Sequence, residues 1–137
     1  MPVLENTVSI LVCEDHEQML SLITEALSVN YPQLAFFSAS NGVAGLQCFR
    51  KHLPDIVITD YSMPFMNGIQ MAREMQSIKD IKLIFISAYS EKTIFGSSAL
   101  IRIDHYLLKP LDLKKLFNAV DDCLTDILKK RVVIEGC

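Results

Sequence analysis

Short apolar, β-rich runs alternate five times with longer amphipathic stretches, and this alternation constrains the fold more than any other feature. The apolar runs cover residues 7–13, 34–38, 55–59, 81–87 and 105–108. Apolar residues at helical spacing predict helices over residues 17–30, from 41 onward, and over 64–78, 91–101 and 111–129. Strands with nearly continuous apolar content are covered on both faces. The sequence therefore predicts a doubly wound α/β fold, with a five-stranded parallel sheet and helices on both faces.

The weakest helical pattern is that of residues 91–101, where Gly96, Ser97 and Ser98 interrupt the middle of the stretch. No firm pattern follows Arg131, and we expect residues 131–137 to be a tail or the start of a linker. The predicted domain covers residues 7–130.

Composition excludes several classes of protein. The chain has 137 residues, half of them hydrophobic, which is enough for one core and argues against disorder. Its net charge of -3 gives no electrostatic footprint for nucleic acid. We find no signal peptide and no apolar run long enough to cross a membrane. The four cysteines lack metal-site spacing and are expected to be reduced, as in a cytoplasmic protein.

Polar side chains follow the predicted strands where ligands bind in such folds, beyond the carboxyl ends. Glu14 and Asp15 end the first strand and Asp60 ends the third. Ser87 ends the fourth strand, and Lys109 follows the fifth. We therefore expect three carboxylates, a hydroxyl and a lysine to converge at one edge of the sheet.

Three carboxylates in one place repel one another unless a cation lies among them. Mg²⁺ suits such a site because it takes one or two carboxylates together with water and phosphate oxygens. Asp15 alone could instead cap the next helix, and a serine after a strand is often only a turn residue. The combination with Lys109 favours a magnesium and phosphoryl site.

These residues resemble the receiver domains of response regulators in two-component signalling, over nearly the whole chain. The matching strings are LVCED at 11–15, DIVITDYSMPFMNG at 55–68, IFISA at 84–88 and HYLLKPLDLKKL at 105–116. The Asp-x-x-Met-Pro-x-Met-x-Gly string is the most specific of them. The resemblance implies a flavodoxin-like strand order of 2-1-3-4-5.

The resemblance also implies a role for each site residue. Asp60 would take a phosphoryl group from a histidine kinase or a phosphotransfer protein. Glu14, Asp15, Asp60 and the backbone carbonyl of Ser62 would hold Mg²⁺, while Lys109 and Ser87 would bind the phosphoryl oxygens. Such a chain is a signalling domain that assists its own phosphorylation, and it is not otherwise an enzyme.

Switching is the second property that the resemblance implies. Tyr106 would turn inward as Ser87 moves toward the phosphoryl group, and Lys109–Pro110 would be a cis peptide. Gly68 would relax the loop after Asp60. Tyr89 is bulky and lies two residues after Ser87, so we hypothesise that it shields the acyl phosphate from water. A homodimer would use the face of the fourth helix, the fifth strand and the last helix.

Three other interpretations compete with an active receiver. A degenerate receiver could serve only protein interaction or dimerisation, but all five site residues are present. A phosphatase of the haloacid dehalogenase type would carry Asp-x-Asp, whereas Tyr61 and Ser62 follow Asp60. A flavodoxin would need a phosphate loop rich in Ser, Thr and Gly, and the acidic CEDHEQ string after the first strand would repel phosphate.

Overall fold

The five apolar runs form a single parallel sheet in the computed structural model, which describes residues 7–95 and 101–136. The strands lie in the order β2-β1-β3-β4-β5, and each pair of neighbours is parallel. Their bounds are β1 Ser9–Cys13, β2 Ala35–Ala39, β3 Ile56–Asp60, β4 Lys82–Ser87 and β5 His105–Leu108. The doubly wound fold and the flavodoxin-like strand order are therefore confirmed.

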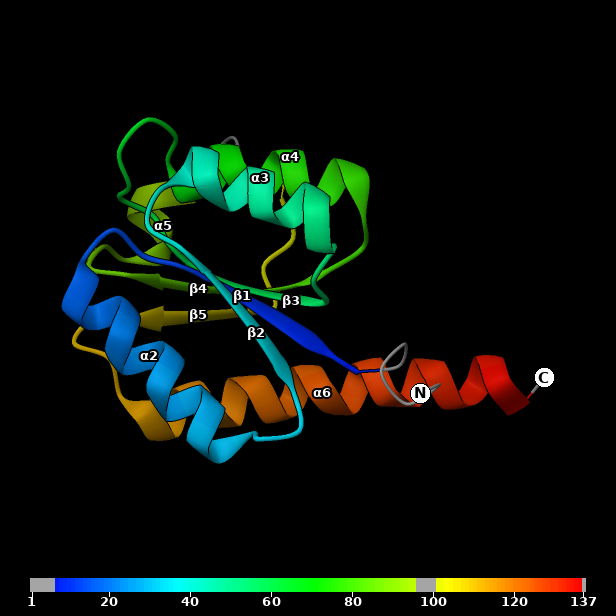
Figure 1. Cartoon of the computed structure of the whole chain (residues 1–137). Helices are drawn as coiled ribbons and strands as arrows, with labels where there is room; N and C mark the ends of the chain where they lie inside the picture. The colour runs from blue at the N-terminus through cyan, green and yellow to red at the C-terminus, as the bar shows by residue number, and fades with distance from the viewer. Residues whose placement is uncertain (1–6, 96–100, 137) are drawn as a thin grey trace.

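Helices cover both faces of the sheet (Figure 1). They are α2 Glu17–Asn30, α3 Gly42–His52, α4 Gly68–Ile78, α5 Glu91–Phe95 and α6 Leu113–Gly136. In Figure 1, α2 and α6 lie below the sheet and α3 and α4 lie above it. Among the described residues, no helix has both the length and the apolar character needed to span a membrane.

Each face of the sheet has its own hydrophobic core, because successive strand residues point to opposite faces. On β1, Ile10 and Val12 pack into the core between the sheet and helices α2 and α6. Leu11 and Cys13 of the same strand pack into the core between the sheet and helices α3 and α4. Burial on both faces explains why the strands are nearly continuous apolar runs in the sequence. Because all the strands are parallel, their carboxyl ends lie along the same side of the sheet.

The third helix begins later than its pattern predicts. The sequence suggested a start at residue 64, but α4 starts at Gly68. Asn67 caps it: the Asn67 side chain accepts from the backbone N–H of Gln70, and the Gln70 side chain accepts from the backbone N–H of Asn67. Phe65 has a φ of 73°, outside the helical region. Residues 61–67 therefore form a loop, and it lies beside the predicted site.

The last two helices also differ from the prediction. Helix α5 covers Glu91–Phe95, and the expected residues 96–100 lie outside the described part of the chain. Ile101 is not helical, so the expected end there was wrong. Helix α6 covers Leu113–Gly136, so the predicted helix end at residue 129 was also wrong. Figure 1 shows α6 running well past the sheet.

Candidate functional site

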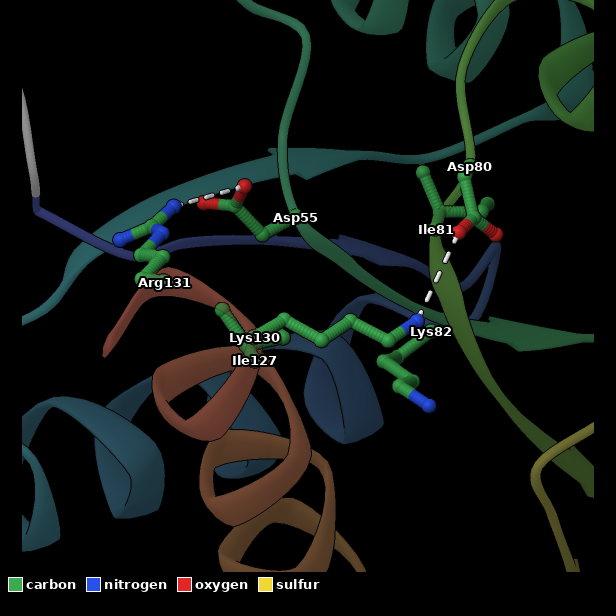
Figure 2. A pocket seen from close by; sticks show the side chains of 7 residues that line it. All are labelled: Asp55, Asp80, Ile81, Lys82, Ile127, Lys130 and Arg131. Atoms are coloured by element: carbon green, nitrogen blue, oxygen red, sulfur yellow. Dashed lines mark hydrogen bonds and ion pairs between the residues drawn. The ribbon is translucent and has the colours of Figure 1, made fainter. Parts of the chain in front are cut away.

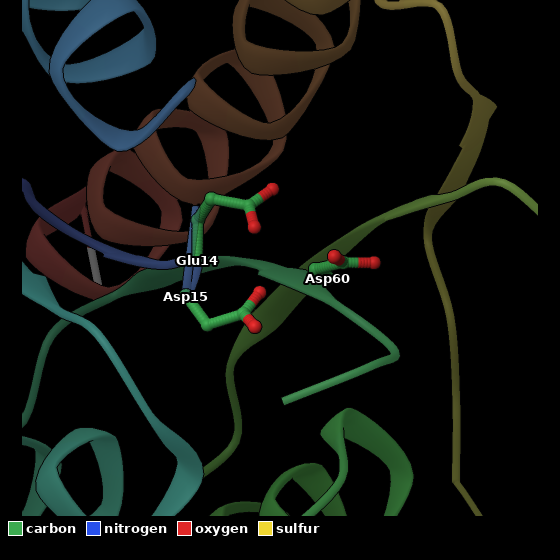
Figure 3. A group of neighbouring side chains, drawn as sticks. All are labelled: Glu14, Asp15 and Asp60. Carbon is green, nitrogen blue, oxygen red and sulfur yellow. The ribbon is translucent and has the colours of Figure 1, made fainter. Parts of the chain in front are cut away.

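The carboxyl ends of β1 and β3 bring three acidic side chains together (Figure 3). Glu14, Asp15 and Asp60 each offer a carboxylate oxygen, and these oxygens all lie within 4.8 Å of one another. The two strands are neighbours in the sheet, with Cys13 paired with Thr59. Residues that follow this pair are therefore adjacent across the sheet, although 45 positions separate Asp15 from Asp60.

Glu14 is the most deeply buried of the three acids, with 2% of its surface exposed. Burial raises the pKa of its carboxyl group, while the backbone N–H of His16 and the ammonium of Lys109 act in the opposite direction. The His16 N–H donates to Glu14 Oε2 at 3.0 Å. The Glu14 N–H donates to the carbonyl of Ala39 at 3.1 Å, which ties this residue to the end of β2.

Lys109 bridges two of the acids. Its Nζ lies 3.1 Å from Glu14 Oε1 and 2.9 Å from Asp60 Oδ2. Burial lowers the pKa of Lys109, but the bonds to Asp60 and Glu14 outweigh burial and hold it above its usual value. The lysine is therefore a fixed positive charge at the acidic cluster. The Lys109–Pro110 bond that follows is cis, as the resemblance implied.

Asp60 is buried, at 7% exposure, whereas Asp15 is exposed. The backbone N–H of Tyr61 donates to Asp60 Oδ1 at 2.7 Å, so each carboxylate oxygen has one donor. Ser62 follows in the exposed part of the loop. The three carboxylates suit a hard cation such as Mg²⁺, so the residues present fit a magnesium site.

Ser87 at the end of β4, Tyr89 just after it and Tyr106 on β5 form a connected group. Ser87 is fully buried, and its Oγ accepts from the Tyr89 N–H at 3.0 Å. The Tyr106 hydroxyl donates to the Tyr89 carbonyl at 2.6 Å. Burial raises the pKa of that hydroxyl, and its hydrogen bond with Ser87 opposes the rise. The Tyr106 ring is parallel to that of Phe85, with centroids 5.8 Å apart.

Gly68 lies where the start of α4 closely approaches the end of β3. The sequence suggested that it relaxes the loop after Asp60. A Cβ at this position would overlap the Asp60 carbonyl oxygen and lie 3.0 Å from Phe85 Cζ. The glycine is therefore required for close approach between the start of α4 and the end of β3. Sequence reasoning also missed the Tyr61 and His16 backbone donors, which carry no side-chain signal.

A second charged pocket lies at the other end of the strands, near the amino ends of β3 and β4 (Figure 2). Asp55 pairs with Arg131 at 3.2 Å, and Asp80 pairs with Lys130 at 3.8 Å. Lys82 pairs with Asp126 of α6 at 3.2 Å. These opposite charges neutralise one another and tie α6 to the sheet.

Comparisons with known proteins identify the family that this chain resembles. A family model described as "Response regulator receiver domain" matches residues 10–121. The chain is 31% identical over 117 residues to "Probable transcriptional regulatory protein NarL" of Mycobacterium tuberculosis, covering 85% of this chain and 54% of that protein. It is 30% identical over 112 residues to "Sporulation initiation phosphotransferase F" of Bacillus subtilis, covering 81% of this chain and 89% of that protein.

A solved structure has the same fold. The N-terminal domain of an uncharacterized protein from Wolinella succinogenes superposes with a TM-score of 0.82 at 28% identity, covering 90% of this chain and 99% of that one. The chain spans about half the length of NarL and of several other curated relatives that it matches. The parallel sheet, the acidic pocket and the family match agree: this chain belongs to the response regulator receiver domain family.

Proposed function

We propose that this receiver takes a phosphoryl group onto Asp60 from a phosphohistidine of a kinase or phosphotransfer protein, with Mg²⁺ bound at the acidic pocket. The observation that carries the proposal is the placement of the Asp60 carboxylate, 2.9 Å from Lys109 Nζ and grouped with Glu14 and Asp15. In the transfer, the phosphorus–nitrogen bond breaks, an Asp60 oxygen forms the new bond to phosphorus, and the imidazole leaves.

Each residue of the pocket has a defined task in this proposal. Glu14, Asp15, Asp60 and the Ser62 carbonyl hold Mg²⁺, directly or through water. The bound cation neutralises negative charge on the transferring group. Lys109 moves from its carboxylate partners to a phosphoryl oxygen. The Ser87 hydroxyl donates to another phosphoryl oxygen, and Tyr106 then changes position to report the modification.

The wider setting of the receiver follows from the same assignment. Receiver domains act with histidine kinases, and we propose a cytoplasmic setting for this one, with no nucleic acid or membrane contact of its own. A homodimer would form through α5, β5 and α6, where β5 is an edge strand of the sheet. The proposed domain spans residues 7–130 and contains the whole family match.

The first test is phosphorylation by a small acyl-phosphate donor. The wild type with Mg²⁺ should gain the mass of one phosphoryl group, whereas Asp60→Asn, which lacks the nucleophilic oxygen, should gain none. Intact-mass measurement with and without a chelator checks both expectations. No gain with any donor would reject the phosphoacceptor role and leave an interaction module.

A second prediction concerns the lifetime of the acyl phosphate. The Tyr89 ring is half exposed and packs edge-on against Tyr61, with centroids 6.2 Å apart, beside the end of β3. Replacing Tyr89 with alanine should open the site to water and speed hydrolysis by a factor on the order of three to ten. Tyr89→Phe keeps the ring and should decay like the wild type. An unchanged half-life in Tyr89→Ala would contradict the shielding hypothesis.

A further inference from the structure

The β3–α4 loop, residues 61–67, carries the Ser62 carbonyl of the proposed magnesium site. Two features fix the ends of this loop. The Gly68 N–H donates to the Tyr61 carbonyl at 2.8 Å, which closes its base. Asn67 is held by its reciprocal bonds with Gln70. Neither feature by itself fixes the residues between these ends, which include Ser62 and Met66.

Met66, just before the end of the loop, lies against Gly42, the first residue of α3. A Cβ on Gly42 would overlap the carbonyl oxygen of Met66 and lie 2.7 Å from Met66 Cβ. Gly42 is buried, so this contact is in the interior. Loop backbone cannot rotate away as the end of a side chain can, and a larger residue here would displace the loop itself.

Gly45, one turn further along α3, is a useful contrast. A Cβ there would lie 2.8 Å from both Cys13 Sγ and Met71 Sδ. These atoms are side-chain sulfurs, and the flexible thioether of Met71 can adjust. Gly45 therefore reflects packing of the helix on the core, whereas Gly42 contacts the backbone of the loop.

The segment before Gly42 is bonded to the other half of the pocket. The Ala39 carbonyl, at the end of β2, accepts from the N–H of Glu14 at 3.1 Å. Two residues later, the Asn41 side chain accepts from the Ala44 N–H at 2.7 Å and fixes the start of α3. The short β2–α3 connection thus contacts Glu14 at one end and the Met66 backbone at the other.

We propose that Gly42 is a positioning residue, which sets the distance between the Ser62 carbonyl and the Glu14, Asp15 and Asp60 carboxylates by letting the loop lie directly on α3. The inference rests on the proposed magnesium site and adds a residue that touches neither the metal nor the phosphoryl group. Groups that orient metal ligands typically change metal affinity by 10–100-fold when they are altered.

The test is Gly42→Ala, with Mg²⁺ affinity measured by isothermal titration calorimetry and stability by thermal unfolding. The Mg²⁺ dissociation constant should rise by about tenfold or more. Gly45→Ala adds the same methyl to the same helix and should change only stability. Asn41→Ala removes the helix cap, lowers stability by about 1 kcal/mol and should leave Mg²⁺ affinity unchanged.

A double-mutant cycle covers the case in which Gly42→Ala does not fold. In a Met66→Gly background the Cβ–Cβ contact is gone, and a glycine at position 66 gives the backbone more freedom to turn its carbonyl away from α3. Gly42→Ala should therefore fold and should raise the dissociation constant less. An equal effect of Gly42→Ala and Gly45→Ala on Mg²⁺ affinity, or an additive cycle, would overturn the inference while the proposed function stands. A wild type that binds no Mg²⁺ would reject the proposed function and, with it, the inference.

Discussion

Replacing Lys109 with methionine should lower the rate of phosphorylation by an acyl-phosphate donor by about 100- to 1000-fold at saturating Mg²⁺. The reason is electrostatic: preorganised donors that meet developing charge contribute this much in enzymes. Lys109 Nζ lies between Glu14 and Asp60, within 3.1 Å of both, so it is already placed at the reacting carboxylate. Methionine keeps an unbranched side chain of similar bulk, one atom shorter, and removes the charge together with the donors to Glu14 and Asp60. The rate is measured from the time course of intact mass.

The chain offers a matched control in Lys82. This lysine is also largely buried and also pairs with two carboxylates, Asp104 at 3.7 Å and Asp126 at 3.2 Å. It lies at the amino end of β4, at the opposite edge of the sheet from Asp60. Lys82→Met should reduce stability and leave the phosphorylation rate unchanged. Similar losses of rate in both variants would mean that Lys109 acts through folding rather than at the site.

The fold could be predicted because its signal is repeated and local. Five apolar runs of strand length, each followed by a turn, leave few arrangements, and β5 was predicted at its observed bounds. The start of α4 was missed because Pro64 resembles a first helical residue, whereas the Asn67–Gln70 capping box decides the boundary. The end of α6 was missed because its last residues lack an amphipathic pattern. Ion pairs to Asp55 and Asp80 hold Arg131 and Lys130 there.

The candidate site was predictable to the level of residues but not of contacts. Strand ends converge in a parallel sheet, and this rule alone placed Glu14, Asp15 and Asp60 together. The Lys109 bridge required the actual positions of β5 and β1, which have β3 and β4 between them. Gly42 could not be found, because nothing in the sequence near residue 42 indicates which backbone lies against it.

Removing the Phe85 ring should lower both the stability of the protein and the rate of phosphorylation at Asp60. The ring is fully buried on β4, parallel to Tyr106 and against the start of α4 at Gly68. Phe85→Ala should reduce the free energy of unfolding by about 3–5 kcal/mol, because the buried ring is lost and a cavity remains. Urea-induced unfolding measures the change, provided that the free energy of unfolding depends on urea concentration with the same slope in both proteins.

Phe49 is a control that separates the expected effect of Phe85 on stability from its expected effect on phosphorylation. It is equally buried in the same core cluster, but it comes from α3. Phe49→Ala should cost a similar free energy of unfolding and leave the phosphorylation rate of the folded protein unchanged. Phe85→Ala should also slow phosphorylation by about tenfold or more, since it removes support beneath the loop after Asp60 and small misplacements there are costly. If both variants lose stability alone, Phe85 supports the fold without positioning the phosphoacceptor.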